Sequence, residues 1–202
     1  MIRLTANRVA GLFTAAFMFA APVLASAATW NIDSDHSSIG FKVRHLMVSN
    51  VKGVFGKVSG LVNIDDSDLG RSSVTATIDT TSIDTGVAKR DAHLKSPDFL
   101  DVAKYPTMTF VSTGLTKGSG GSFKVLGNLT LHGVTRPVVL DVEGLSSEIK
   151  DPIGILRRGA TASTTINRKD FGLTWNKMME AGGVAVGDEV KISIEVELTK
   201  AK

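Results

Sequence analysis

The chain of 202 residues contains no cysteine. This absence excludes disulfides, thiolate metal sites and covalent attachment of a c-type haem. Beyond the N-terminal segment, no stretch is apolar enough to cross a bilayer as a helix. No run of lysine and arginine marks one face of the chain either, so we expect no nucleic-acid-binding surface. The core must therefore hold the fold together without disulfides.

The N-terminal segment has the features of a secretory signal peptide. Arg3 and Arg8 precede an apolar run over residues 9–21, and Ala25-Ser26-Ala27 has the small-x-small pattern of a cleavage site. The apolar run is short for a membrane anchor. Cleavage there leaves one domain over residues 28–202, which we expect to be periplasmic or secreted. Loss of the two arginines lowers Lys plus Arg from 23 to 21 against 20 Asp plus Glu, a net charge of +1.

The clearest pattern in the chain lies between residues 121 and 144. Apolar residues and one glycine occupy every second position of two runs: Phe123, Val125, Gly127, Leu129 and Leu131, then Val138, Leu140 and Val142. A period of two is typical of a strand with one buried face. Gly133 and Pro137 separate the runs, so the pattern predicts an antiparallel hairpin.

Similar patterns predict the rest of an antiparallel sheet. Further strands are expected at residues 39–48, 51–64, 74–79, 108–112, 158–166 and 190–198. The glycines within 51–64 suggest bulges or sharp bends. Residues 87–100 have helical spacing that Pro97 ends, which predicts one short helix or helical loop. The sequence therefore predicts an all-β protein of about eight strands, arranged as a single barrel or sandwich.

One face of the strand at residues 39–48 is a candidate binding surface. Alternation places Phe41, Val43, His45 and Met47 on that face. If the face lines a cavity, His45 would be a polar contact for the head group of a ligand. The alternative is a core histidine that hydrogen-bonds a neighbour.

Two groups of charged residues have the composition of acid–base partners. One comprises Arg90, Asp91 and His93, and the other comprises Arg168 and Asp170. The alternative for both is that they hold loops across the mouth of the barrel.

Catalytic and cofactor motifs are absent from the sequence. It has no Gly-x-Ser-x-Gly or Ser-x-x-Lys pattern and no Gly-rich phosphate loop. The four histidines lack the spacing of a local metal site. We therefore expect no catalytic residues, no metal and no cofactor.

Several stretches match a known family in the right order over essentially the whole mature chain. They are Ile32-Asp33 with His36-Ser37, Phe41–His45, Gly53–Gly56 with Gly60, Ser82–Gly86, Arg90-Asp91 with His93–Phe99, Tyr105-Pro106 with Phe110, Gly127–Val138, Asn167–Gly172, and the closing strand after Val186-Gly187-Asp188. On these residues the chain resembles the YceI-like family of polyisoprenoid-binding or lipid-binding proteins.

The resemblance implies an extended antiparallel barrel, similar to lipocalins, with an apolar tunnel that holds an isoprenoid chain or another long amphiphile. We therefore expect an exported carrier that performs no chemistry. The residues expected to line the lumen are Phe41, Val43, His45 and Met47, with Phe110, Leu129 and Leu131.

Two other functions remain open at this point. One is a hydrolase or isomerase that acts on such a lipid through His45 or through the group of Arg90, Asp91 and His93. The other is a stress or interaction protein with a filled barrel. In each case an exposed edge strand would allow two copies to form a homodimer.

Overall fold

The computed structural model describes residues 27–180 and 182–202, so residues 1–26 of the predicted signal peptide lie outside the described part. Over these residues the strands are β1 (Ala28–Ile32), β2 (Ser38–His45), β3 (Ser49–Phe55), β4 (Val58–Ile64), β5 (Ser73–Asp79), β6 (Ile83–Asp84), β7 (Thr107–Lys117), β8 (Phe123–Leu131), β9 (Val134–Glu143), β10 (Ile149–Lys150), β11 (Leu156–Asn167) and β12 (Val186–Lys200). The α-helix is α1 (Ala88–Lys95), and 3-10 turns lie at Ser34–His36, Leu69–Arg71, Thr80–Ser82 and Arg168–Phe171. No helix in this part of the chain is long and apolar enough to span a membrane.

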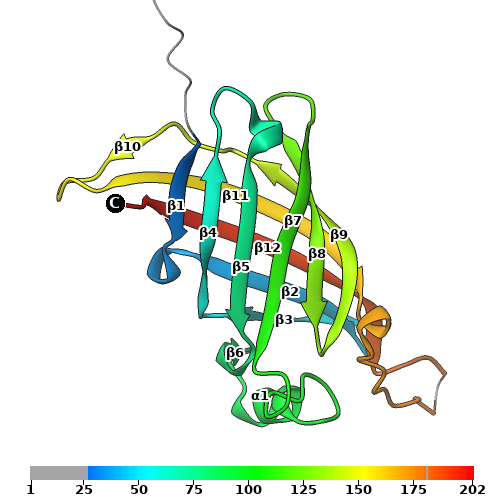
Figure 1. The fold of residues 1–202 in the computed structure, drawn as a ribbon. Helices are drawn as coiled ribbons and strands as arrows, with labels where there is room; N and C mark the ends of the chain where they lie inside the picture. Colours follow the sequence, from blue (N-terminus) through cyan, green and yellow to red (C-terminus); the bar gives the residue numbers. More distant parts are fainter. Residues whose placement is uncertain (1–26, 181) are drawn as a thin grey trace, which may run out of the picture.

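Eight of the strands close into an antiparallel barrel, as predicted. The ring runs β11-β9-β8-β7-β5-β4-β1-β12, and β12 pairs back onto β11. Figure 1 shows β4, β5, β7 and β8 crossing in front of β11, β12 and β2. Strands β2, β3 and β6 extend the sheet beyond β12, which is long enough to pair with both β1 and β2 along one edge.

The strand predicted at residues 39–48 is three residues too long. β2 ends at His45, and a tight turn follows in which Leu46 and Met47 have φ values of 48° and 59°. The amide of Val48 closes this turn by donating to the carbonyl of His45 at 3.1 Å. Turns with two left-handed residues usually carry Asn or Gly there, so the turn had no sequence signal.

The strand predicted at residues 51–64 is two strands. β3 pairs with β2 and β4 pairs with β1, and Gly56 and Lys57 form the bend between them. β1 and β2 are themselves separated by the 3-10 turn at Ser34–His36. The amide of Val58 donates to Ser34 Oγ at 3.3 Å, which ties the two bends together. The expectation of a bend at Gly56 was therefore correct, but the bend ends one strand and starts the next instead of only curving a single strand.

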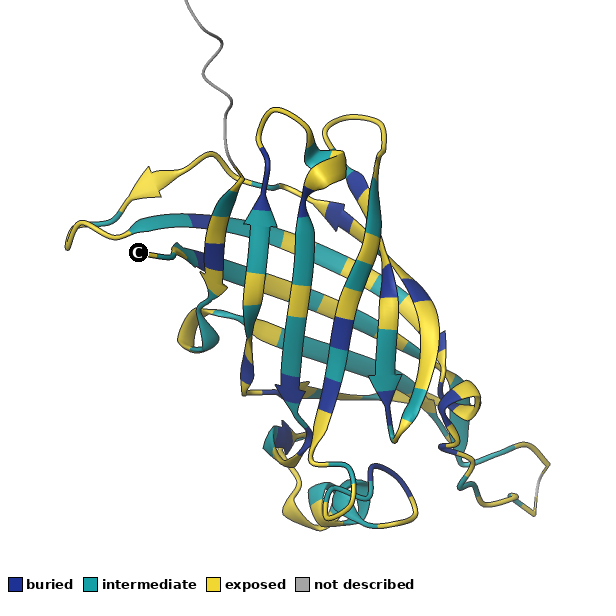
Figure 2. Cartoon of the chain, in the orientation of Figure 1, coloured by how far each residue is buried: buried dark blue, intermediate teal, exposed yellow. Residues whose placement is uncertain are grey.

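Buried and exposed residues alternate along the strands (Figure 2), so the barrel has an apolar inner face and a polar outer face. The inward residues form three packed groups: one around Trp30, Ile64 and Leu198, one around Phe110, Phe123, Val125 and Val142, and a larger one that includes Phe55, Leu100, Leu131 and Phe171. Helix α1 covers the barrel end that lies near the third group (Figure 1), where Leu94 packs against it. The predicted short helix thus lies at one mouth of the barrel.

Candidate functional site

The interior of the barrel contains an apolar cavity with a volume of about 300 Å³. This volume is at the lower end of the range for small-molecule sites, so the cavity suits one slim ligand. Its wall comprises inward residues of all eight ring strands and of β2, among them Phe41, Val62, Ala76, Phe110, Val125, Leu140, Ala162 and Ile194. The charged residues along it are Arg168 and Glu195.

Five of the seven residues expected to line the lumen do so: Phe41, Val43, Phe110, Leu129 and Leu131. His45 and Met47 are not among the cavity-lining residues, so the expectation for these two was wrong. Met47 is in the turn after β2 and is 42% exposed. His45 is the last residue of β2 and pairs with Ser49 and Val186 at the strand end. Contact of the five lining residues with a ligand stays a prediction.

Two phenylalanine rings of the cavity wall lie over glycines of neighbouring strands. A Cβ atom at Gly53 would be 2.5 Å from Phe41 Cζ, and one at Gly127 would be 2.3 Å from Phe110 Cζ. These distances are too short for any side chain. Glycine at both positions therefore lets the rings lie flat against the wall, which keeps the lumen open.

The charged group at helix α1 holds a loop. Asp91 accepts hydrogen bonds from the amide and hydroxyl of Thr85 at 2.9 and 2.5 Å, and Arg90 donates to Thr85 Oγ1 and O at 2.7 and 2.9 Å. His93 instead pairs with Asp98, with 2.9 Å between Nε2 and Oδ2. All three side chains are thus engaged in local contacts that pin the segment before and after α1.

An aromatic cluster lies beside these contacts. The ring of His93 makes edge contacts with Phe99 and Trp175 at centroid distances of 5.0 and 4.9 Å, and Phe99 and Trp175 are 5.0 Å apart. Phe99 is buried and lines the cavity. The cluster therefore closes the cavity at the α1 end.

Arg168 has a structural importance that its sequence context did not signal. The predicted pair with Asp170 does not form: the carbonyl of Asp170 instead accepts a hydrogen bond from Arg136 Nε at 3.1 Å. Arg168 is 3% exposed, and burial lowers its pKa. Its guanidinium donates to the carbonyl of Leu173, to that of Trp175 at 2.9 Å and to that of Gly187 at 2.9 Å.

Arg168 also approaches one carboxylate, since 3.5 Å separates its Nη2 from Asp188 Oδ1. The backbone carbonyls it binds come from both ends of the loop between β11 and β12. The side chain therefore fastens this loop at the end of the cavity. Only the folded chain could reveal this role, because the partners are backbone atoms.

The pairing between β9 and β11 is short. These strands pair only through Thr161–Glu143, Ala162–Val142 and Ser163–Asp141. Beyond that point a groove separates them, and four of its lining residues also line the cavity: Val138, Thr164, Ile166 and Ile192. The groove is thus a candidate side route into the lumen, and the hydrogen bond from Arg136 spans it on the outside.

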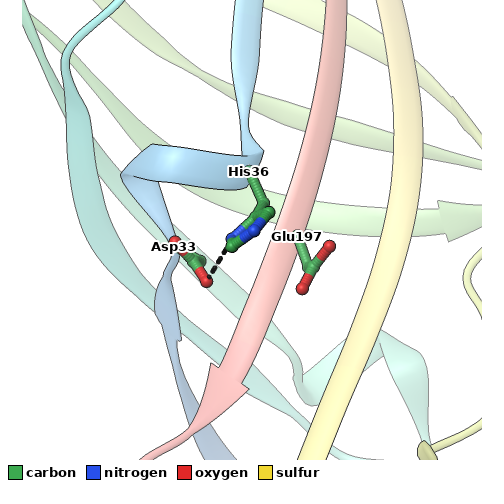
Figure 3. Close-up of side chains that lie close together, drawn as sticks. All are labelled: Asp33, His36 and Glu197. Atoms are coloured by element: carbon green, nitrogen blue, oxygen red, sulfur yellow. Dashed lines mark hydrogen bonds and ion pairs between the residues drawn. The ribbon is translucent and has the colours of Figure 1, made fainter. Parts of the chain in front are cut away.

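A charged cluster lies on the outer side of β12. The side-chain ligand atoms of Asp33, His36 and Glu197 lie within 4.8 Å of one another (Figure 3). The guanidinium of Arg157 already neutralises the carboxylates, since its Nη1 is 2.7 Å from Asp33 Oδ2 and 2.6 Å from Glu197 Oε1. Its Nε donates to Asp151 at 2.8 Å. The arrangement is therefore that of an ion-pair network that joins β1, β11 and β12.

This network predicts acid-dependent stability. The hydrogen bonds from Arg157 lower the pKa values of Asp33 and Asp151. A lowered folded-state pKa contributes stability above the unfolded value, and that contribution is lost as the pH falls through the folded value. We therefore expect Tm to fall steeply below about pH 4. Arg157→Met should flatten this slope, as measured by circular dichroism melts across pH.

Lys124→Met is the matched control, because it removes the surface ion pair with Asp141 and leaves the network intact. A fall of Tm with acid that is as steep in Arg157→Met as in the native protein would contradict the prediction.

His36 adds a smaller effect of opposite sign. Its hydrogen bond to Asp33 raises the pKa of His36, so its contribution to stability is present below about pH 6.5 and disappears as the pH rises through the raised value.

Known proteins match both the sequence and the fold. The YceI-like domain matches residues 30–198. A UPF0312 protein of Vibrio cholerae is 42% identical over 154 residues, which cover 75% of this chain and 81% of that relative. The crystal structure of the Campylobacter jejuni YCEI protein is 31% identical with a TM-score of 0.67, over 78% of this chain and 90% of that one.

A polyisoprenoid binding domain from Saccharophagus degradans, described as implicated in plant cell wall breakdown, has the same fold. Its TM-score is 0.62 at 19% identity, over 87% of this chain and 99% of that one. The domain match spans most of the chain, from the first barrel strand to the last. The chain therefore belongs to the YceI-like family.

Proposed function

We propose that this protein is an exported carrier that holds one long apolar molecule, an isoprenoid chain or a similar amphiphilic lipid, inside its barrel. The observation that carries the proposal is the apolar cavity of about 300 Å³. Burial of each methylene group contributes about 0.8 kcal/mol before the cost of ordering the chain. A lumen lined by aliphatic and aromatic side chains therefore selects a ligand by its length and apolar character.

The name of the Saccharophagus degradans domain supports the choice of ligand class, because that domain is described as binding polyisoprenoids. Several residues of the present cavity are well suited to branched chains. Ala76, Ala160 and Ala162 leave room between larger neighbours such as Phe110 and Phe123. Alternating small and large residues would accommodate the methyl branches of an isoprenoid.

Binding without chemistry fits the arrangement of polar groups better than catalysis. His45, the main candidate base, is at a strand end and outside the cavity lining. Arg90 and Asp91 hold Thr85, and His93 is occupied by Asp98. The buried guanidinium of Arg168 is bound to backbone carbonyls. None of these groups is arranged around a shared reacting position.

Export is the second element of the proposal. The basic, apolar and small-residue parts of residues 1–27 support it. A molecule with a long apolar chain is insoluble in an aqueous compartment such as the periplasm. A barrel that shields the chain would allow it to leave one membrane and reach another.

Extraction of the purified protein with organic solvent, followed by mass spectrometry, tests the proposal. We expect a long-chain lipid in the extract at close to one molecule per protein. The control is the same protein stripped of lipid by denaturation and refolding, which should take up an added isoprenoid alcohol again. A protein that yields no lipid and does not take up the added chain would exclude the carrier function.

A further inference from the structure

Three lysines lie side by side on the outer surface of the sheet. Lys191 of β12 is directly opposite Lys42 of β2, which is directly opposite Lys52 of β3. Phe41 and Val43, on either side of Lys42, line the cavity, so Lys42 is on the outer face. Lys191 and Lys52 are on the same face, because they pair directly with Lys42. We call these lysines the basic row. Like charges directly opposite one another destabilise a sheet. The row therefore lowers the stability of the fold, and stability does not account for its presence.

The basic row has no carboxylate partner within the described residues, where the lysines in ion pairs are Lys124, Lys169 and Lys200. Protection of a sheet edge accounts for Lys52, because β3 is an edge strand over most of its length. It does not account for the other two lysines, since β2 and β12 are paired on both sides. The basic row forms no run in the sequence, because its three lysines come from three different strands.

Exposed apolar side chains lie at the end of the same hairpin. Leu46, Met47 and Val48 in the turn between β2 and β3 are 40%, 42% and 76% exposed. Met178, in the loop before β12, is 73% exposed. The loop lies against the turn, because the amide of Leu46 donates to the carbonyl of Ala185 at 2.8 Å. We call Leu46, Met47, Val48 and Met178 the apolar tip.

We propose that the apolar tip and the basic row together dock this end of the barrel onto a membrane surface that contains anionic lipids. Apolar side chains that enter the head-group region and lysines that face anionic lipids are the two contributions that hold proteins at such surfaces. The strand rise places Lys42 and Lys52 about 13 Å from Leu46 and Val48, since each lysine is four residues from the nearest tip residue. This distance is between one and two Debye lengths at physiological ionic strength, so the lysines still attract a surface that the tip touches, and added salt weakens the attraction.

Docking in this way would bring the cavity next to the bilayer. Val43 lines the cavity and is three residues before Leu46, and Val186 lines it beside Ala185. On β12 the carboxylate nearest to the basic row along the chain is that of Glu189, two residues from Lys191. The surface binding proposed here is separate from the cargo, so it holds or fails independently of the proposed function.

A second copy of the chain fits this surface less well than a lipid bilayer. Pairing of two β3 edges would continue the sheet from one copy into the other and would bring two basic rows into it. The resulting repulsion between lysines disfavours such a dimer. Anionic lipid head groups would instead attract the lysines and reduce the repulsion between them.

Vesicle sedimentation tests the proposal. The purified protein is mixed with vesicles of phosphatidylcholine alone, or of phosphatidylcholine with phosphatidylglycerol. We expect strong binding to the anionic vesicles, weak binding to the neutral ones, and loss of binding as salt is added. Replacement of Lys42, Lys52 and Lys191 by Gln should weaken binding by about fivefold for each lysine, or on the order of a hundredfold together.

The matched charge control replaces by Gln three exposed lysines at the end of β7, the end of β10 and the C-terminus: Lys117, Lys150 and Lys202. These three chain segments lie away from the turn between β2 and β3 (Figure 1). The net charge of this control equals that of the first triple variant, yet its binding should be unchanged. Removal of the repulsion within the basic row should maintain or raise Tm, so weaker binding is not explained by misfolding.

The apolar tip is tested by Leu46→Asn with Met47→Gly. These residues favour the left-handed φ values of the turn, so the fold should be at least as stable. Binding to anionic vesicles should nevertheless fall about tenfold or more, because two apolar side chains are lost. Three results would overturn the proposal: equal binding by both triple variants, binding of DNA in place of vesicles, or a dimer in light scattering that the tip variant abolishes.

Discussion

Arg168→Met should lower the free energy of unfolding by about 3 kcal/mol, because it removes the donor of one buried and two partly buried carbonyls. Methionine retains most of the volume of the arginine side chain but none of its hydrogen bonds. The buried carbonyl of Leu173 and the partly buried carbonyls of Trp175 and Gly187 then lose this donor. Urea unfolding followed by tryptophan fluorescence measures the change, with the transition treated as two-state.

Arg136→Met is the matched control for this prediction. Its side chain is exposed and donates one hydrogen bond, to the carbonyl of Asp170. The expected loss is therefore below about 1 kcal/mol. Hydrogen exchange adds a second measurement, since only Arg168→Met should accelerate exchange in the loop before β12. Equal losses in the two variants would show that the buried guanidinium does not fasten the loop.

Ala162→Phe should reduce the amount of bound lipid at least tenfold while the barrel stays folded. Ala162 lies on β11 at the cavity wall, opposite Val142 of β9 and Ile194 of β12. A phenylalanine ring there would extend across a lumen of about 300 Å³ and leave too little room for a chain. Quantitative extraction and mass spectrometry give the bound lipid, and a fluorescent polyene displacement assay gives the affinity.

Thr161→Phe is the control, because this neighbouring residue on β11 is exposed on the outer face. Its lipid content should match that of the native protein. The Tm of Ala162→Phe should stay close to the native value, since the added ring is apolar and enters an existing space. A variant that keeps its full lipid content would show that the ligand does not occupy this part of the lumen.

The alternation of residues was sufficient to predict which side chains point inward along most strands. Phe110, Leu129 and Leu131 line the cavity as expected, because a strand under regular pairing keeps the period of two. The prediction failed for Met47, where two left-handed residues end β2 without an Asn or Gly to signal a turn. Alternation is a local property, so it cannot reveal where a strand stops unless the residue types change as well.

The sequence by itself determined that the chain is an antiparallel all-β protein whose strands have one apolar face, with one short helix. Those properties follow from the local order of residues: period-two alternation, turn residues and Pro97. The same patterns fit a barrel or a sandwich, and the resemblance to the YceI-like family implied the barrel. Only the tertiary structure decided that Arg168 fastens a loop through backbone carbonyls and that Lys191, Lys42 and Lys52 stand in one row. Partners far apart in sequence meet through strand register, and register is set by the packing of the whole barrel.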